Sequence, residues 1–165
     1  MKKHRIEFIA VTALWLGLWP LHTYISLWLS YPMRRIAAEV VTVLLEAMGF
    51  SVMTENTAIY LEGSSPIVIA DACSGVEGLI ALVFIGWILA RLMQKSFAFA
   101  LVHYLFALPA IVFANVVRLV ITALGFRWFG QVVLDSTCHN LLGYFQLMLA
   151  FGFFYLAGLL IRKVS

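Results

Sequence analysis

The chain has 165 residues, of which 64% are hydrophobic and only 12% charged, and its net charge is +3. A soluble domain carries about 25% charged residues, so this composition excludes an ordinary soluble domain and indicates one helix bundle in lipid. The sequence also has no basic–aromatic stripe, no glycine-rich phosphate loop and no metal-type spacing of cysteines and histidines, so we expect no nucleic-acid partner, no metal and no other cofactor.

The first predicted span covers residues 6–29 and follows a basic N-terminus. This start resembles a secretory signal, but the apolar stretch is much longer than the roughly 7–15 residues of a signal core, and no clean Ala-x-Ala site follows it. We therefore expect the segment to be retained and to end at Tyr31-Pro32. Residues 33–50 are too charged for a span and predict an amphipathic helix lying at the membrane interface.

The character of the sequence changes over residues 51–70, which predict a small β-hairpin outside the bilayer. Residues 57–61 and 67–69 are rich in β-prone side chains. Between them, residues 62–66 (Glu-Gly-Ser-Ser-Pro) have the composition of a turn.

Three further spans are predicted at residues 75–92, 97–124 and 139–161, since roughly 20 apolar residues suffice to cross a bilayer. Pro109 predicts a kink in the second of these. A polar connector, residues 125–137, leads to the last span.

The predicted fold is therefore an all-α membrane protein, a four-span transmembrane helix bundle with an interfacial helix and a small hairpin, all in one domain of residues 1–165. Placing the N-terminus inside leaves few basic residues outside, namely Arg34, Arg35, Arg118 and Arg127. It puts more at the inner ends of the spans, namely Lys2, Lys3, Arg5, Arg91, Lys95, Arg162 and Lys163. The positive-inside rule then predicts cytoplasmic termini and an extracytoplasmic hairpin and connector.

This topology brings three reactive residues to one depth. Cys73 precedes the second span and His139 opens the fourth, both at the outer face. Arg118 lies about 21 residues into the third span, or about 32 Å at 1.5 Å per residue, which is roughly one hydrocarbon thickness. Sequence spacing does not establish whether the three side chains meet laterally.

Cys73 stands immediately before a Ser-x-x-Glu capping box, Ser74 to Glu77, that opens the second span. The positive end of a helix dipole at this place favours the thiolate, which is the nucleophilic form. The alternatives are a small apolar filler or one half of a disulfide with Cys138, which an extracytoplasmic location permits. Glu77 is expected to cap rather than to catalyse, and Asp71 either caps the turn or orients a catalytic group.

Arg118 is an ionisable residue within membrane-grade apolar sequence, which is by default a functional-site hypothesis. Its alternative role is to reach lipid phosphate at the surface. Asn115, one turn earlier on the same face, could hold the guanidinium or donate a hydrogen bond of its own. His139 lies in the first turn of the last predicted span, where the helix dipole favours a neutral imidazole that can accept a proton. The alternative is an interfacial histidine with no function.

Three sequence motifs resemble those of the exosortase/archaeosortase family. Residues 69–76 (Ile-Ala-Asp-Ala-Cys-Ser-Gly-Val) resemble its Cys-Ser-Gly motif, and residues 115–118 (Asn-Val-Val-Arg) resemble its Asn-x-x-Arg motif. His139, with Gly143 one turn later, is similar to its third signature. The motifs occur in the family's order, and the resemblance covers roughly Gly49 to the C-terminus.

The resemblance implies an inner-membrane cysteine transpeptidase with its active site at the extracytoplasmic face. Such enzymes process exported proteins that carry a C-terminal sorting signal, namely a short motif, a transmembrane helix and a basic tail. It implies that Cys73 is the nucleophile, that Arg118 stabilises substrate or oxyanion, and that His139 is the acid and base. The supporting residues would be Asn115, Asp71, Ser74 and Glu77. Besides this substrate, membrane lipid is an expected partner, and the acceptor stays open among an amine, a glycan or lipid hydroxyl, and water.

Two other classes of function compete with this interpretation. A four-span thiol/disulfide redox protein would suit two outward cysteines, but the sequence lacks Cys-x-x-Cys, and Arg118 and His139 would have no role. A non-catalytic membrane assembly factor, or a small channel subunit, would tolerate replacement of each reactive residue.

Overall fold

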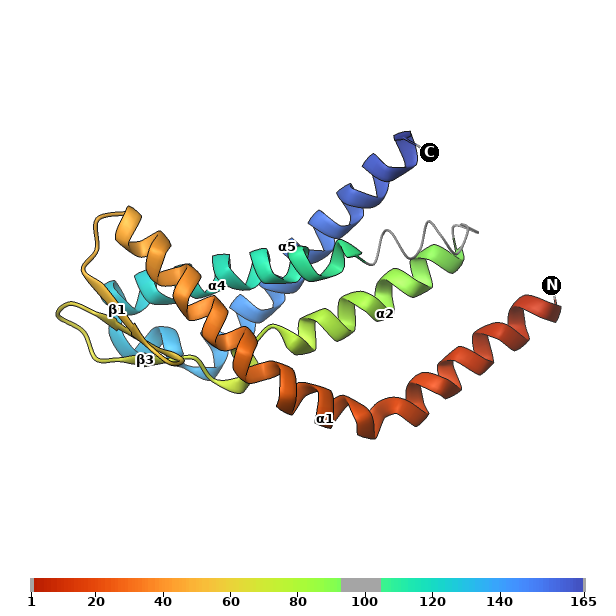
Figure 1. Ribbon diagram of the computed structural model, residues 1–165, viewed down its shortest axis with the longest axis horizontal. Helices are drawn as coiled ribbons and strands as arrows, with labels where there is room; N and C mark the ends of the chain where they lie inside the picture. Colours follow the sequence, from red (N-terminus) through yellow and green to blue (C-terminus); the bar gives the residue numbers. More distant parts are fainter. Residues whose placement is uncertain (1, 93–104, 165) are drawn as a thin grey trace.

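The computed structural model describes residues 2–92 and 105–164 (Figure 1). Its elements are α1 (Lys2–Ala47), β1 (Val52–Glu55), β2 (Ala58–Leu61), β3 (Ile67–Val68), the 3-10 helix η1 (Asp71–Cys73), α2 (Val76–Leu92), α4 (Ala107–Phe129), the 3-10 helix η2 (Gly130–Leu134) and α5 (Ser136–Val164). The molecule is elongated, with the sheet at one end and both chain termini towards the other.

Helix α1 is continuous across Pro32, so the predicted break between a span and a separate helix at residues 33–50 is wrong. A proline removes one backbone hydrogen bond and crowds the preceding turn, which locally favours a helix end. Packing overrides this preference, because the C-terminal half of α1 buries a helical stripe against α4 and the sheet. That stripe consists of Ala37, Ala38, Val41 and Leu45. The helix ends at Ala47, before Gly49, whose φ of 90° suits a left-handed helix terminus.

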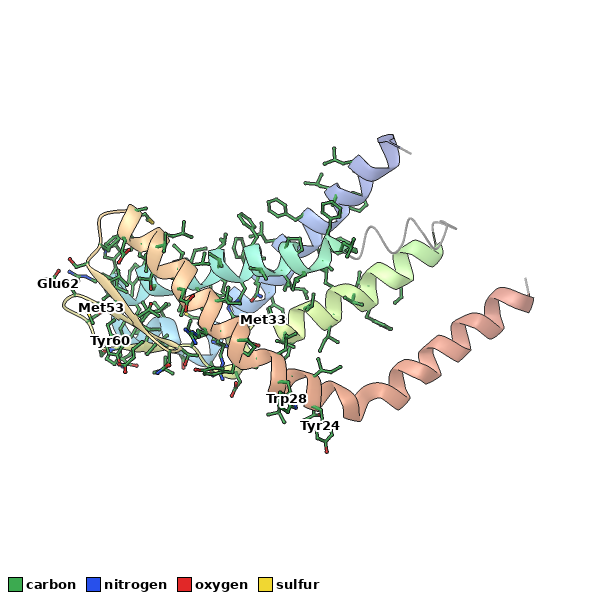
Figure 2. The ribbon with its side chains drawn as sticks, in the orientation of Figure 1. Tyr24, Trp28, Met33, Met53, Tyr60 and Glu62 are labelled. Carbon is green, nitrogen blue, oxygen red and sulfur yellow. The ribbon has the colours of Figure 1, made fainter. Side chains whose placement is uncertain are left out.

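The N-terminal half of α1 extends away from the sheet end of the molecule (Figure 1). Tyr24 and Trp28 lie on this part of the helix and expose most of their rings, 65% and 83% respectively (Figure 2). Exposed tyrosine and tryptophan are typical of helices at a membrane–water interface. The interfacial position predicted for residues 33–50 itself remains a prediction.

Residues 51–70 form a three-stranded antiparallel sheet of order β1-β2-β3, where a two-stranded hairpin was expected. Strands β2 and β3 pair across the predicted turn, with Ile59 opposite Ile67. The additional strand, β1, pairs with β2. Ile59 and Leu61 alternate with the more exposed Tyr60, so one face of the sheet closes the core between α1 and α4.

Helix α2 covers the predicted span 75–92 almost completely. Of the predicted span 97–124, residues 97–104 lie outside the described residues. Pro109 lies in the first turn of α4, and a turn at Phe106 separates α4 from the helical residue Leu105 before it. The kink predicted at Pro109 stays a prediction, because the segment that precedes this turn lies outside the described residues. A second core joins α2, α4 and α5 through Leu82, Ala107, Ala110, Ile111, Ala114, Ala150 and Phe154.

The predicted bounds of the polar connector, residues 125–137, are wrong at both ends. Helix α4 continues to Phe129, and Gly130, with a φ of 66°, ends it. Helix η2 follows, and α5 already begins at Ser136, so the apolar stretches are longer and the link shorter than expected. His139 consequently lies in the first turn of α5, and its N–H donates to the Asp135 carbonyl at 2.9 Å.

Two stretches of the described residues are long and apolar enough to cross a membrane, Ala107–Leu134 and Ser136–Leu160. Helix α2 contributes a shorter apolar stretch, Val76–Gly86. This supports a membrane protein, whereas the number of spans remains a prediction.

Candidate active site

Cys73 is carried by a short loop between the sheet and α2. It ends η1, where its N–H donates to the Ala70 carbonyl at 2.9 Å. Gly75 follows with a φ of 82°, and a Cβ at this position would lie 3.3 Å from Asn115 Cγ. The left-handed backbone and the close approach of α4 both favour glycine here. Ser74 and Gly75 therefore form a turn between Cys73 and the start of α2 at Val76.

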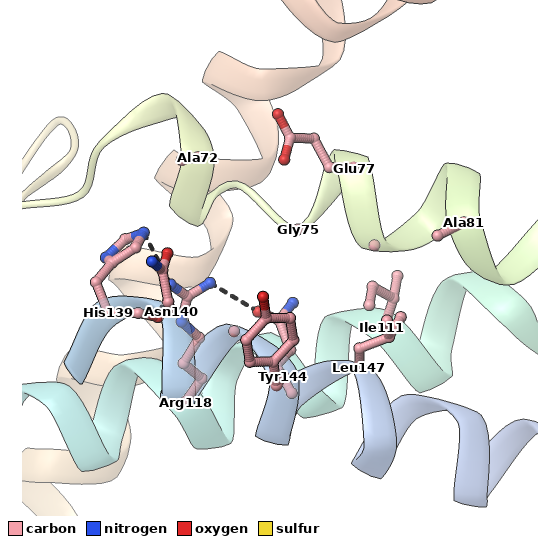
Figure 3. Close-up of a pocket in the computed structure, with 13 residues that line it drawn as sticks. Ala72, Gly75, Glu77, Ala81, Ile111, Arg118, His139, Asn140, Tyr144 and Leu147 are labelled. Carbon is pink, nitrogen blue, oxygen red and sulfur yellow. Dashed lines mark hydrogen bonds between the residues drawn. The ribbon is translucent and has the colours of Figure 1, made fainter. Parts of the chain in front are cut away.

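The predicted capping box is not formed. Ser74 Oγ accepts from the Val76 N–H at 3.3 Å, and the Ser74 N–H donates to the Asp71 carbonyl at 3.0 Å instead of to Glu77. Glu77 is exposed at the start of α2 (Figure 3). Ser74 therefore caps the helix without a reciprocal glutamate.

Asp71 connects the Cys73 loop to α1. Its Oδ1 accepts from Ser30 Oγ at 2.9 Å and forms an ion pair with Arg34 Nη2 at 2.8 Å. Arg34 Nη1 also donates to the Ile69 carbonyl at 3.1 Å. Of the two roles considered for Asp71, its contacts support orientation, because it fixes the loop that carries the cysteine.

Cys73, His139 and Arg118, from three separate elements, come together beside the first turn of α5. Cys73 Sγ lies 3.8 Å from His139 Nδ1 and 3.9 Å from His139 Nε2. Arg118 Nη2 lies 3.1 Å from Nε2 and donates to the His139 carbonyl at 3.3 Å (Figure 3). A guanidinium has only donors, so Nε2 must accept, the ring is neutral, and its proton sits on Nδ1.

Two amide side chains complete the cluster. Asn115 Nδ2 donates to the Cys73 carbonyl at 3.1 Å, so Asn115 holds the backbone of the cysteine rather than the guanidinium. Gln146 Oε1 accepts from Arg118 Nη1 at 2.9 Å, a contact that the sequence analysis missed. Gln146 lies two helical turns after His139, so a polar residue on the same face of an apolar helix was the available clue.

Burial raises the pKa of the Cys73 thiol, and this effect outweighs the positive charge of Arg118 and a backbone hydrogen bond from Ala70, which both lower it. Burial therefore favours the thiol form of Cys73 in this resting geometry, whereas the helix dipole alone favours the thiolate. Both cysteines are free thiols, so the disulfide alternative is not present. No group of metal-ligating side chains occurs among the described residues.

A cavity of about 360 Å³ opens beside the cluster, and Arg118 and His139 reach into it. Cys73 is not itself part of the lining. The other lining residues are largely small or apolar and come from α2, α4, α5 and the loop before α2: Ala72, Gly75, Glu77, Gly78, Ala81, Ile111, Asn140, Gly143, Tyr144, Gln146 and Leu147. Gly143 faces the guanidinium: a Cβ there would lie 3.9 Å from Arg118 Nη2, in ordinary van der Waals contact.

The fold and this cluster define a helical membrane protein in which a cysteine, a histidine and an arginine gather beside a cavity. The chain matches the transmembrane exosortase family over residues 3–156 and belongs to that family. The match confirms the family that the sequence resembled, and it begins at residue 3, well before Gly49. No curated protein and no solved structure matches the chain.

Proposed function

We propose that this protein is a membrane-embedded cysteine transpeptidase that cleaves C-terminal sorting signals of exported proteins and transfers the product to an acceptor. The observation that carries the proposal is the approach of Cys73 Sγ to the ring of His139, 3.8 Å from Nδ1 and 3.9 Å from Nε2, with Arg118 bound to Nε2. A nucleophile, a base and a cation are thereby available to one scissile bond. Family membership supports a substrate with a short motif, a transmembrane helix and a basic tail.

Substrate binding activates the thiol in this mechanism. At rest the lone pair of His139 Nε2 is occupied by Arg118, although Nε2 is nearly as close to Cys73 Sγ as Nδ1 is. When the carbonyl oxygen of the substrate takes the Nη2 donor of Arg118, Nε2 becomes free to accept the proton of the thiol. The thiolate then forms only when a peptide carbonyl is in place.

The bond changes follow from these positions. The thiolate of Cys73 attacks the carbonyl carbon, a C–S bond forms, and Arg118 stabilises the oxyanion. The C–N bond breaks as the imidazolium of His139 gives its proton to the departing amine, which leaves a thioester. The acceptor, an amine, a glycan or lipid hydroxyl, or water, loses a proton to His139 and attacks the thioester. The C–S bond then breaks, and the thiol is restored when the sulfur regains that proton.

We further propose four spans in the inner membrane, with both termini cytoplasmic and the sheet and the cluster at the extracytoplasmic face. Two features support this orientation. The termini lie towards the opposite end of the molecule from the sheet, and most lysines and arginines of the sequence fall near the proposed inner ends of the spans (Figure 1). The basic tail of a substrate would remain on the inner side for the same reason, while its short motif reaches the cavity.

Replacing Cys73 by alanine tests the proposal in a host that makes a cognate signal-bearing protein. We expect Cys73→Ala to abolish processing, and the wild-type enzyme to yield a peptide thioester at Cys73 by mass spectrometry. Cys138→Ala is the matched control, since Cys138 is a free, partly exposed thiol outside the cluster, and it should process normally. Undiminished processing by Cys73→Ala would eliminate the nucleophile assignment.

The same two variants separate the competing functions. A thiol/disulfide redox protein would lose its function with either cysteine and would oxidise thiols with a quinone. An assembly factor would tolerate both replacements.

A further inference from the structure

Gln146 is a buried polar residue to which neither the sequence motifs nor the proposed mechanism gives a role. It lies in α5 among apolar side chains and is only 4% exposed. An amide buried in this way destabilises a protein unless its polar atoms are hydrogen-bonded. Its Oε1 accepts from Arg118 Nη1 at 2.9 Å, so this contact accounts for the carbonyl half of the amide.

The contact fixes the plane of the Arg118 guanidinium. Gln146 holds Nη1, whereas His139 holds Nη2 through its ring and its backbone carbonyl. Both partners lie on α5, seven residues apart on one face. The planar guanidinium is therefore attached at two points of one rigid helix, which sets where its donors point.

The neutrality of Gln146 matters as much as its position. Among the described residues no carboxylate forms an ion pair with Arg118, although this side chain is only 5% exposed. A neutral acceptor orients the guanidinium and leaves its charge uncompensated. A glutamate at the same position would orient it equally well but would cancel that charge before a substrate arrived.

The orientation of the Gln146 amide agrees with its role as a neutral acceptor for Arg118. Because the arginine can only donate, the oxygen of the amide must face Arg118 and the nitrogen must face away. Gln146 Nε2 lies 3.8 Å from the place where a Cβ on Gly78 would stand, and both residues line the cavity. The amide is thus part of the wall that a substrate would meet.

We propose that Gln146 is a positioning residue that holds Arg118 in place for the developing oxyanion while leaving its positive charge free. The inference rests on the proposed transpeptidase function and adds a residue to it. Its effect is exerted through Arg118 and is strongest in the transition state, so loss of Gln146 lowers kcat more than it raises KM.

Two replacements of Gln146 test the two parts of this role in the full-length enzyme. Gln146→Met keeps the shape but removes the acceptor, and we expect kcat for processing to fall by about 10²-fold, as when an oxyanion donor is displaced, with KM close to that of the wild type. Gln146→Glu keeps the acceptor but adds a charge, and we expect kcat to fall as well. Gln131→Met makes the same change at an exposed glutamine of η2 and should be unaffected.

A second measurement needs neither substrate nor turnover. The rate of Cys73 alkylation by iodoacetamide is followed against pH in a Cys138→Ala background, where Cys73 is the only thiol. The charge of Arg118 lowers the pKa of the Cys73 thiol, so neutralising that charge with Gln146→Glu should move the alkylation profile to higher pH. Because an added carboxylate raises the thiol pKa by itself, the uncharged Gln146→Met variant separates the roles. Its profile should also move to higher pH if the released guanidinium leaves the sulfur, whereas a merely structural role for Gln146 would leave the profile of folded Gln146→Met in place.

The outcomes separate the two proposals. Wild-type kcat in both Gln146 variants, while Cys73→Ala is inactive, would overturn the role of Gln146 and leave the transpeptidase function standing. Normal processing by Cys73→Ala would overturn the function, and the alkylation profile would still report whether residue 146 controls the charge beside Cys73. If Gln146→Met does not fold, Gln146→Glu alone decides, because an unshifted profile with wild-type kcat contradicts the proposal.

Discussion

Two arginines from different helices contact the candidate site, and they differ in their partners. Arg34, on α1, forms an ion pair with the carboxylate of Asp71 and secures the loop that carries Cys73. Arg118, on α4, is bound by the neutral acceptors of Gln146 and His139. The charge of the first is compensated within the protein, which suits a structural contact. The charge of the second has no carboxylate partner among the described residues, which suits the catalytic role proposed for it.

Arg118→Lys is the strongest test of the difference between the two arginines. The lysine keeps the charge, but one ammonium group on a flexible stem cannot bridge Gln146 and His139 as a planar guanidinium does. We expect kcat for processing to fall about 10²- to 10³-fold, the loss typical of a displaced oxyanion donor. Rates are measured on the signal-bearing protein, with Arg127→Lys as the control, because Arg127 is exposed in the last turn of the same helix. A rate equal to that of the wild type would show that only the charge of Arg118 matters.

A second test asks whether the substrate binds in the cavity that Arg118 lines. A Cβ at Gly78 would come within 2.6 Å of Ile111 Cδ1, so Gly78→Ala must displace that methyl group or the helix. Overpacking of this kind costs about 1–3 kcal/mol of folding stability. Because Gly78 and Ile111 both line the cavity, the displaced atoms also reduce the space for a substrate, and we expect KM to rise about 10-fold, or about 1.4 kcal/mol of binding free energy. Gly152→Ala is the matched control on α5, since nothing lies within 4 Å of its added Cβ. An unchanged KM for Gly78→Ala would place the substrate elsewhere.

The sequence predicted the reactive residues of the site but not the contacts that hold them. Cys73, Arg118 and His139 were expected at one depth, because helical rise and hydropathy determine depth along the membrane normal. Gln146 and the Arg34–Asp71 ion pair were missed, because such contacts depend on how each helix is rotated about its own axis. That rotation is set by packing between elements distant in the sequence.

Where local patterns failed, tertiary packing or burial had the larger effect. Pro32 favours a helix end, yet α1 continues because its next turns bury a stripe in the core. The helix dipole favours a thiolate at Cys73, yet burial of the sulfur dominates its pKa. Residues 52–55 form a strand only because β2 offers them a partner. In each case the deciding energy comes from a neighbour that the local sequence does not specify.

The smallest effect is expected on the Arg34 side. Arg34→Gln removes the ion pair with Asp71, whose side chain is 79% exposed, so the pair contributes about 0.2–1 kcal/mol. The amide still offers a donor to the Ile69 carbonyl, and processing should fall no more than about fivefold, the factor that corresponds to 1 kcal/mol. Arg35→Gln is the control, because Arg35 pairs with Glu39 on the exposed surface of the same helix and should have no effect on the rate.

A loss with Arg34→Gln as large as that with Arg118→Lys would contradict the division between a structural and a catalytic arginine. It would mean that the position of the Cys73 loop is held mainly by α1, and that a small displacement of the sulfur is as costly as losing the donor for the oxyanion. The alkylation profile of Cys73 distinguishes these cases. A displaced loop changes the burial of the sulfur and hence its pKa, whereas loss of the Arg34–Asp71 ion pair without displacement leaves that burial, the largest cause of the raised pKa, unchanged.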